Sequence, residues 1–128
     1  MGESETGYIN LIRATSLRRL HGFYAYGWGD NELLISSVTT GQGEGLFELS
    51  SRDIILFKRH PEAISARNLL RCRVTDIFES GPRMGVEMDC GGERLIAEVV
   101  EKAVNELDIT TGQEIFAAIK ASAFRRLA

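Results

Sequence analysis

Apolar and polar residues alternate along three segments in the second half of the chain, 70–75, 86–90 and 95–99. A period of two places every other side chain on the same face, which is typical of half-buried β-strands. Residues 79–82 predict the turn between the first two strands. The glycine pair at 91–92 predicts a two-residue hairpin before the third, because glycine adopts the positive φ that such turns require.

The periodicity changes after the third of these strands. Apolar residues at helical spacing predict a short helix over 101–107. A turn is expected at 110–113, a fourth strand over 115–119 and a last one within 123–127. About five strands with one helical turn before the fourth are compatible with an OB-like β-barrel, so we expect an all-β fold.

The first half has a similar but less regular pattern. Residues 9–15, 22–26 and 32–38 are predicted as strands, and 28–31 as the turn between the last two. We therefore expect a second OB-like barrel of about five strands in this half.

A short repeat relates the two halves. Thr-Thr-Gly-Gln occurs at 39–42 and again at 110–113, each followed by a similar strand. The order of strands around the repeat favours a tandem duplication. In this alignment Lys120 corresponds to Ser50, and no Ser-x-Arg-Asn motif precedes Ile9. If the halves are copies, the first half has lost its pair of cations.

The proline that follows His60 disfavours a helix and indicates a linker between the halves. The predicted organisation has four parts. They are 1–7, a disordered or artificial end; 8–60, a divergent first unit; 61–63, a linker; and 64–128, a second unit.

Composition excludes several classes of protein. The 128 residues are 44% hydrophobic and 26% charged, which is typical of a globular domain and not of a disordered chain. No apolar run reaches the ~20 residues of a membrane helix, and the acidic start is unlike a signal peptide. We therefore expect a cytoplasmic protein. The net charge of −3, with neither half basic, opposes sequence-independent nucleic-acid binding.

The two cysteines, Cys72 and Cys90, fall on the apolar phase of predicted strands. Neither belongs to a CxxC pair or has the spacing of metal ligands. We expect both to be small core residues, and we disfavour a structural disulfide in a cytoplasmic chain.

Two short motifs carry the candidate chemistry, Ser65-Ala66-Arg67-Asn68 and Lys120-Ala121-Ser122. Each joins a cation to a hydroxyl beside small residues, so together they offer two positive charges, two hydroxyls and backbone N–H groups to one small oxyanion. Each motif also has a plainer interpretation. Arg67 at a strand end is typical of a solvated side chain, and Lys120 of a residue that protects an edge strand from aggregation.

Catalytic motifs are absent from the sequence. His21 and His60 have no catalytic residues around them, and no lysine belongs to a phosphate-binding GxxxxGK[ST] loop. We therefore do not expect this chain to be an enzyme or to bind ATP. The aromatic residues between 23 and 28 favour core packing or a subunit contact, although exposed aromatics on an OB fold can also stack on bases.

Residues 64–128 resemble the molybdate-binding Mop domain, which is also grouped under the name TOBE. The resemblance rests on the two motifs above, the glycine pair at 91–92, Ala97, Leu107 and Gly112, all in the same order along the chain. Residues 8–60 look like a divergent first Mop unit. Such a pair is similar to the C-terminal regulatory region of the ATPase subunit of molybdate ABC importers.

The resemblance implies two OB-like barrels in a homodimer, often with exchanged strands, and oxyanion sites at interfaces. It places Ser65 and Arg67 at one edge of a site and Lys120 with Ser122 at the other, with molybdate or tungstate as ligand and no cofactor. The other partners it implies are the membrane subunits, reached through an ATPase domain that this chain lacks, at the inner face of the membrane. One departure is Val99-Val100, where the family commonly has Ile-Thr.

Three hypotheses follow. The leading one is a regulatory module that senses intracellular molybdate or tungstate and thereby restrains transport. The second is a dimerisation or docking module whose oxyanion site is vestigial. The third, which the acidic charge opposes, is an OB-type nucleic-acid binder.

Overall fold

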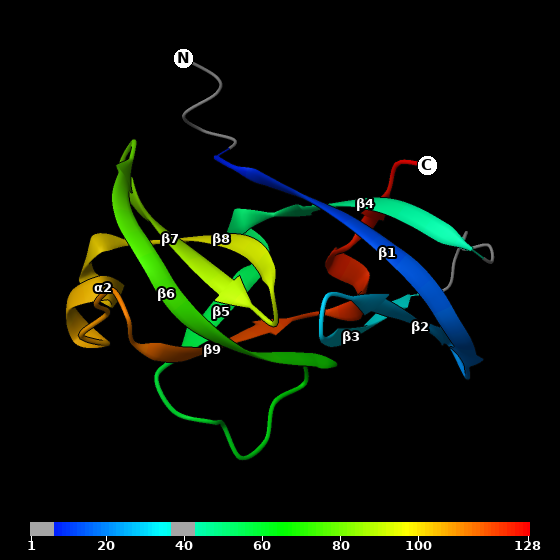
Figure 1. Cartoon of the computed structure of the whole chain (residues 1–128). Helices are drawn as coiled ribbons and strands as arrows, with labels where there is room; N and C mark the ends of the chain where they lie inside the picture. The colour runs from blue at the N-terminus through cyan, green and yellow to red at the C-terminus, as the bar shows by residue number, and fades with distance from the viewer. Residues whose placement is uncertain (1–6, 37–42) are drawn as a thin grey trace.

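A computed structural model describes residues 7–36 and 43–128. It confirms the all-β expectation, because two five-stranded antiparallel sheets make up the described part of the chain (Figure 1). The strands of the first half are β1 (Ile9–Leu20), β2 (Phe23–Trp28), β3 (Asn31–Ser36), β4 (Glu44–Ser50) and β5 (Ile54–Phe57), with the 3-10 turn η1 (Ser51–Asp53) before β5. Those of the second half are β6 (Asn68–Ser80), β7 (Arg83–Cys90), β8 (Glu93–Val99), β9 (Glu114–Ile119) and β10 (Arg125–Arg126), with α2 (Glu101–Glu106) and the 3-10 turn η2 (Ala121–Ala123).

Each sheet takes one edge strand from the other half of the chain. The strand orders are β10-β4-β1-β2-β3 and β5-β9-β6-β7-β8. β5 leaves the first half and pairs with β9, where Ile54 lies opposite Ile119. β10 returns from the end of the chain and pairs with β4, where Arg125 lies opposite Glu48. Figure 1 shows both crossings, with β5 beside β9 and the red C-terminal segment beside β4.

The two sheets are built on one plan, so positions in one half have counterparts in the other. Asn10 on β1 lies opposite Leu49 on β4, and Asn68 on β6 lies opposite Ile119 on β9. The hairpins agree as well, because Trp28 pairs with Asn31 as Cys90 pairs with Glu93. This symmetry supports the predicted duplication. The first copy of the Thr-Thr-Gly-Gln repeat, at 39–42, lies outside the described residues, as do residues 1–6.

The sequence located the strands of the second half well. Buried and exposed side chains alternate along β6, and α2 forms where helical spacing predicted it. Gly91 and Gly92 turn between β7 and β8 with φ of 59° and 91°, values that favour glycine. Among the described residues, no helix is long and apolar enough to cross a membrane.

The expectation about the cysteines was wrong in one respect. Cys72 and Cys90 are core residues, as predicted, but they form a disulfide with their Cα atoms 4.4 Å apart. The reason is the register of β6 and β7, which pairs the adjacent residues Arg73 and Asp89 and so brings the cysteines face to face. That Cα separation lies within the range a disulfide bridges.

Candidate anion-binding site

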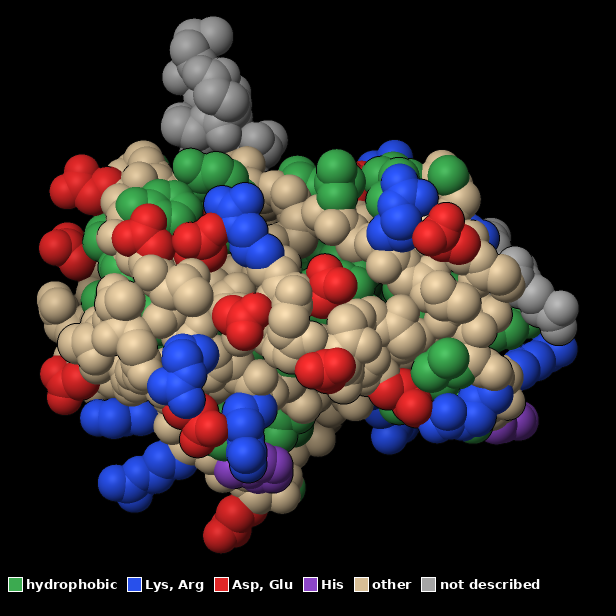
Figure 2. Space-filling model, in the orientation of Figure 1, with side chains coloured by type: hydrophobic (Ala, Val, Ile, Leu, Met, Phe, Trp, Pro, Cys, Tyr) green, Lys and Arg blue, Asp and Glu red, His purple; other side chains and the backbone are tan. Residues whose placement is uncertain are grey.

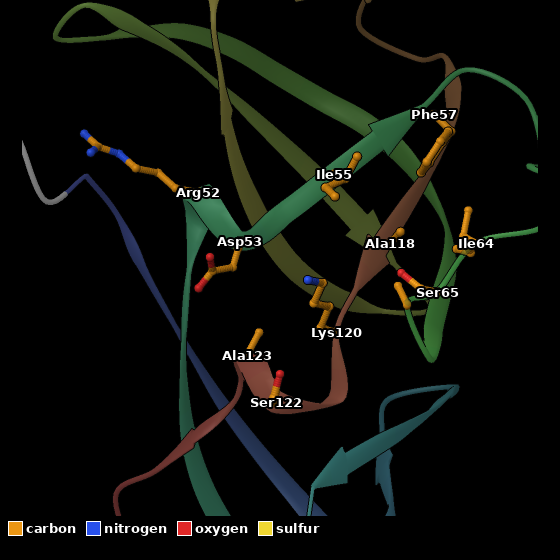
Figure 3. Close-up of a pocket in the computed structure, with 11 residues that line it drawn as sticks. Arg52, Asp53, Ile55, Phe57, Ile64, Ser65, Ala118, Lys120, Ser122 and Ala123 are labelled. Carbon is orange, nitrogen blue, oxygen red and sulfur yellow. The ribbon is translucent and has the colours of Figure 1, made fainter.

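A pocket of about 540 Å³ lies where η1 and β5 meet the end of β9 and η2. Four residues of the two predicted motifs line it: Ser65, Ala66, Lys120 and Ser122. Its other lining residues are Arg52, Asp53, Ile55, Phe57, Ile64, Ala118 and Ala123. Strand β5, which belongs to the first half but pairs with β9, therefore forms one wall of the pocket. The opposite wall belongs to the second half (Figure 3).

Lys120 provides the positive charge of this pocket. It directly follows β9 and occupies the N-cap position of η2, where its backbone is extended with φ −70° and ψ 144°. Its side chain is exposed and lies between Asp53 on one side and Ser65 on the other in Figure 3. Ser65 and Ser122, which each carry a hydroxyl, line the same pocket. A cation with two hydroxyls is suited to a small oxyanion.

The three other residues of the predicted motifs lie elsewhere. The guanidinium of Arg67 stacks over the ring of Phe23, 5.3 Å from its centroid, and does not line the pocket. Ala121 is buried inside η2. Asn68 is also buried, and its amide bonds to the backbone of two other strands, so its role in this structure is to join β6 to β3 and β9.

Sequence reasoning missed two charged residues of the pocket. Arg52 is one of the residues that line the pocket, but its guanidinium points away from the other labelled side chains (Figure 3). Asp53 places a carboxylate in the pocket, which opposes the binding of an anion. Both residues follow Ser50, the counterpart of Lys120. Extending the alignment of the halves by a few residues was the signal that would have found them.

The Arg52 guanidinium instead faces the buried side chain of Glu98, with its Nε 3.6 Å from Glu98 Oε1. The same carboxylate oxygen accepts hydrogen bonds from the Tyr8 backbone N–H, at 3.2 Å, and from Ser51 Oγ, at 2.6 Å. Ser80 Oγ donates to the other oxygen. Burial by itself raises the pKa of Glu98, but these hydrogen bonds and the charge of Arg52 outweigh it and hold the pKa below the ordinary 4.5.

Charge is mixed on the face of the molecule that Figure 2 shows. Figure 2 shows acidic and basic side chains interspersed over the visible face. The net charge of −3 and this mixed face provide no broad positive field, so we attribute the electrostatic attraction of an anion to local groups such as Lys120. Among the described residues, His, Cys, Asp and Glu side chains form no group of three or more that could hold a metal ion.

A comparison with known protein families finds a match for the second half of the chain. Residues 64–125 match the TOBE domain family. Its sequence relatives include proteins named "Molybdenum import ATP-binding protein ModC". The one from Brucella abortus (strain 2308) is 38% identical over 79 residues, which are 61% of this chain and 22% of that protein. The one from Haemophilus influenzae is 28% identical over 121 residues, 94% of this chain and 34% of that protein.

This chain thus spans between about a fifth and a third of the length of these relatives. A similar fold occurs in a crystal structure of the cytoplasmic molybdate-binding protein ModG with molybdate bound. The TM-score is 0.74 at 23% sequence identity, and the match covers 90% of this chain and 92% of that one. Since the match extends over both halves, it confirms the overall architecture of two similar sheets.

Proposed function

We propose that this chain is an oxyanion-binding regulatory domain that belongs to the ATP-binding subunit of a molybdate importer, with molybdate or tungstate as its ligand. The observation that carries the proposal is the pocket that gathers Lys120, Ser65 and Ser122 from separate elements. The names of the sequence relatives and of the ModG neighbour support molybdate as the ligand.

The physical chemistry of the ligand agrees with these groups. Molybdate and tungstate are tetrahedral dianions whose four oxygens accept hydrogen bonds. A hydrogen bond to a charged group contributes roughly 1.5–3 kcal/mol. The ammonium of Lys120 and the hydroxyls of Ser65 and Ser122 supply a few such bonds, while Asp53 subtracts from the attraction. We expect the pocket of a single copy to bind more weakly than a site with a further cation.

Arg67 is the natural source of that further cation. It is exposed and held over Phe23 by a contact that costs little to release in solvent. In the proposed mechanism two copies form a homodimer, and the anion brings Arg67 and Lys120 together from facing chains. The anion stabilises the arrangement that binds it better, and this shift in population restrains transport.

Isothermal titration with molybdate, tungstate and sulfate tests the proposal. We expect heat with the first two, and binding about 10- to 100-fold weaker in Lys120→Ala, because a charge-assisted bond is lost. Lys102→Ala is the matched control, since Lys102 pairs with Glu106 on α2 and does not line the pocket. Absence of heat with every anion would refute the proposal in its ligand-binding form.

Asp53 in the pocket favours a second candidate, a dimerisation or docking module with a vestigial oxyanion site. In that case the Lys120→Ala and Arg67→Ala variants would assemble as the unmodified protein does, at any molybdate concentration. Sedimentation with and without molybdate separates the two candidates. A change of assembly with molybdate that both variants abolish would exclude the vestigial site.

A further inference from the structure

Glu98 is an internal anion with a complete set of donors. Its side chain has no exposed surface, yet three hydrogen-bond donors and one guanidinium surround the carboxylate. These groups come from the start of β1, from η1 and from the end of β6, so three separate segments converge on one side chain of β8. Burying a charge is unfavourable unless such partners compensate it.

The backbone beside Glu98 is also shaped to admit an anion. Gly7 has a φ of +70°, and a Cβ atom built on it would lie 1.7 Å from Glu98 Oε1. Any other residue at this position would therefore displace the carboxylate from its present position. The chain comes this close to the oxygen because position 7 has no side chain, and the next residue, Tyr8, donates its N–H to the same oxygen.

The internal symmetry relates this arrangement to the proposed oxyanion site. Gly7 and Tyr8 precede Asn10 as Ser65 and Ala66 precede Asn68. Leu49 corresponds to Ile119 in the same way. Ser51 is therefore the counterpart of Ala121, and Arg52 is the counterpart of Ser122. All four first-half residues touch or face the Glu98 carboxylate. Their four counterparts all belong to the predicted motifs.

The position of Glu98 itself differs between the halves. Asn10 bonds to the backbone of Ile96, two residues before Glu98 on β8. Asn68 bonds to the backbone of Leu34, two residues before Ser36 on β3. The counterpart of Glu98 is therefore Ser36, a short neutral side chain. One half carries its own carboxylate where the other has a hydroxyl.

We infer that the first half contains a second anion-binding site, which Glu98 fills with its own carboxylate. When the side chain is shortened, this site accepts a small carboxylate or oxyanion from solution. The inference stands on the contacts of Glu98 and goes beyond the proposed function, which concerns the pocket around Lys120. It means that the first half is held permanently in its anion-filled form.

The experiment is chemical rescue of the full chain. Glu98→Ala and Glu98→Ser remove the carboxylate, and serine is the residue that the counterpart position already has. We expect both variants to melt about 10 °C lower than the unmodified protein in sodium chloride, because buried cationic and N–H donors lose their partner. Sodium formate at equal ionic strength should restore at least half of that loss. It should leave unchanged both the unmodified protein and Glu62→Ala, a variant of an exposed loop glutamate.

If the Glu98 variants do not fold in chloride, refolding is followed by circular dichroism in both salts. Folding in formate and not in chloride supports the inference. Equal behaviour in the two salts, folded or unfolded, overturns it. Repeating the rescue in a Lys120→Ala background separates this inference from the proposed function, because that substitution should leave the formate effect intact even if molybdate binding is lost.

Discussion

Asn10 and Asn68 make the same three hydrogen bonds from opposite halves of the molecule. Asn10 donates to the carbonyls of Leu49 and Ile96 and accepts from the Ile96 N–H at 2.8 Å. Asn68 donates to the carbonyls of Ile119 and Leu34 and accepts from the Leu34 N–H at 2.7 Å. Each amide thereby ties its own sheet to an outer strand of the other sheet.

Replacing Asn68 by alanine is expected to destabilise the fold by about 3 kcal/mol, because a buried N–H and two carbonyls lose their partners. Asn10→Ala should have a similar effect, since the three bonds are the same. Urea unfolding followed by fluorescence measures both. Asn105→Ala, on the exposed face of α2, is the control. A loss below 1 kcal/mol in both core variants would contradict this account.

Asp53→Asn is expected to tighten molybdate binding by about fivefold, because it removes a partly screened negative charge from the pocket. Isothermal titration at two salt concentrations measures the effect, which should shrink at the higher one. Asp89→Asn, an exposed change on β7, should leave the affinity as it was. Unchanged affinity in Asp53→Asn would place the anion away from this pocket.

The lowered pKa of Glu98 predicts that the free energy of unfolding decreases as the pH falls. Below pH 4.5 the unfolded chain takes up a proton that the folded carboxyl resists, so the contribution of Glu98 is lost as the pH falls through its folded pKa. Glu98→Gln should be less stable at pH 7 and should lose less on acidification. Melting temperatures between pH 3 and 7 test this. Glu62→Gln should follow the unmodified protein, and parallel curves for all three would refute the prediction.

Reduction of the Cys72–Cys90 disulfide is expected to cost about 3 kcal/mol, as for loops of this length. Thermal unfolding with and without a phosphine reductant measures the loss. The double variant Cys72→Ala/Cys90→Ala should melt at the same temperature in both conditions. If the unmodified protein is equally insensitive, the disulfide does not form in solution.

The sequence predicted where strands form better than it predicted which strands pair with one another in the sheets. Alternation along β6 identifies a half-buried strand, and Gly91 identifies the hairpin after β7. The pairing of β5 and β10 has no such signal, because a strand has the same pattern whichever neighbour it joins. β10 is also too short, at two residues, to have a period.

The prediction of the candidate site was incomplete for a similar reason. Lys120 and Ser65 were found because a cation and a hydroxyl beside small residues are visible in the sequence, whereas the position of Arg67 over Phe23 depends on a tertiary contact. Glu98 was missed because alternation assigns it to the solvent-facing side of β8. The other half covers that side, so the four residues from Leu95 to Glu98 are all buried.

The crossing of β5 and β10 has a consequence for what happens when the chain is cut. A protease that cleaves the exposed segment between β5 and β6 separates the sequence into two pieces, but each piece still contributes a strand to the sheet of the other. The nicked protein should therefore migrate as one particle until denaturant is added.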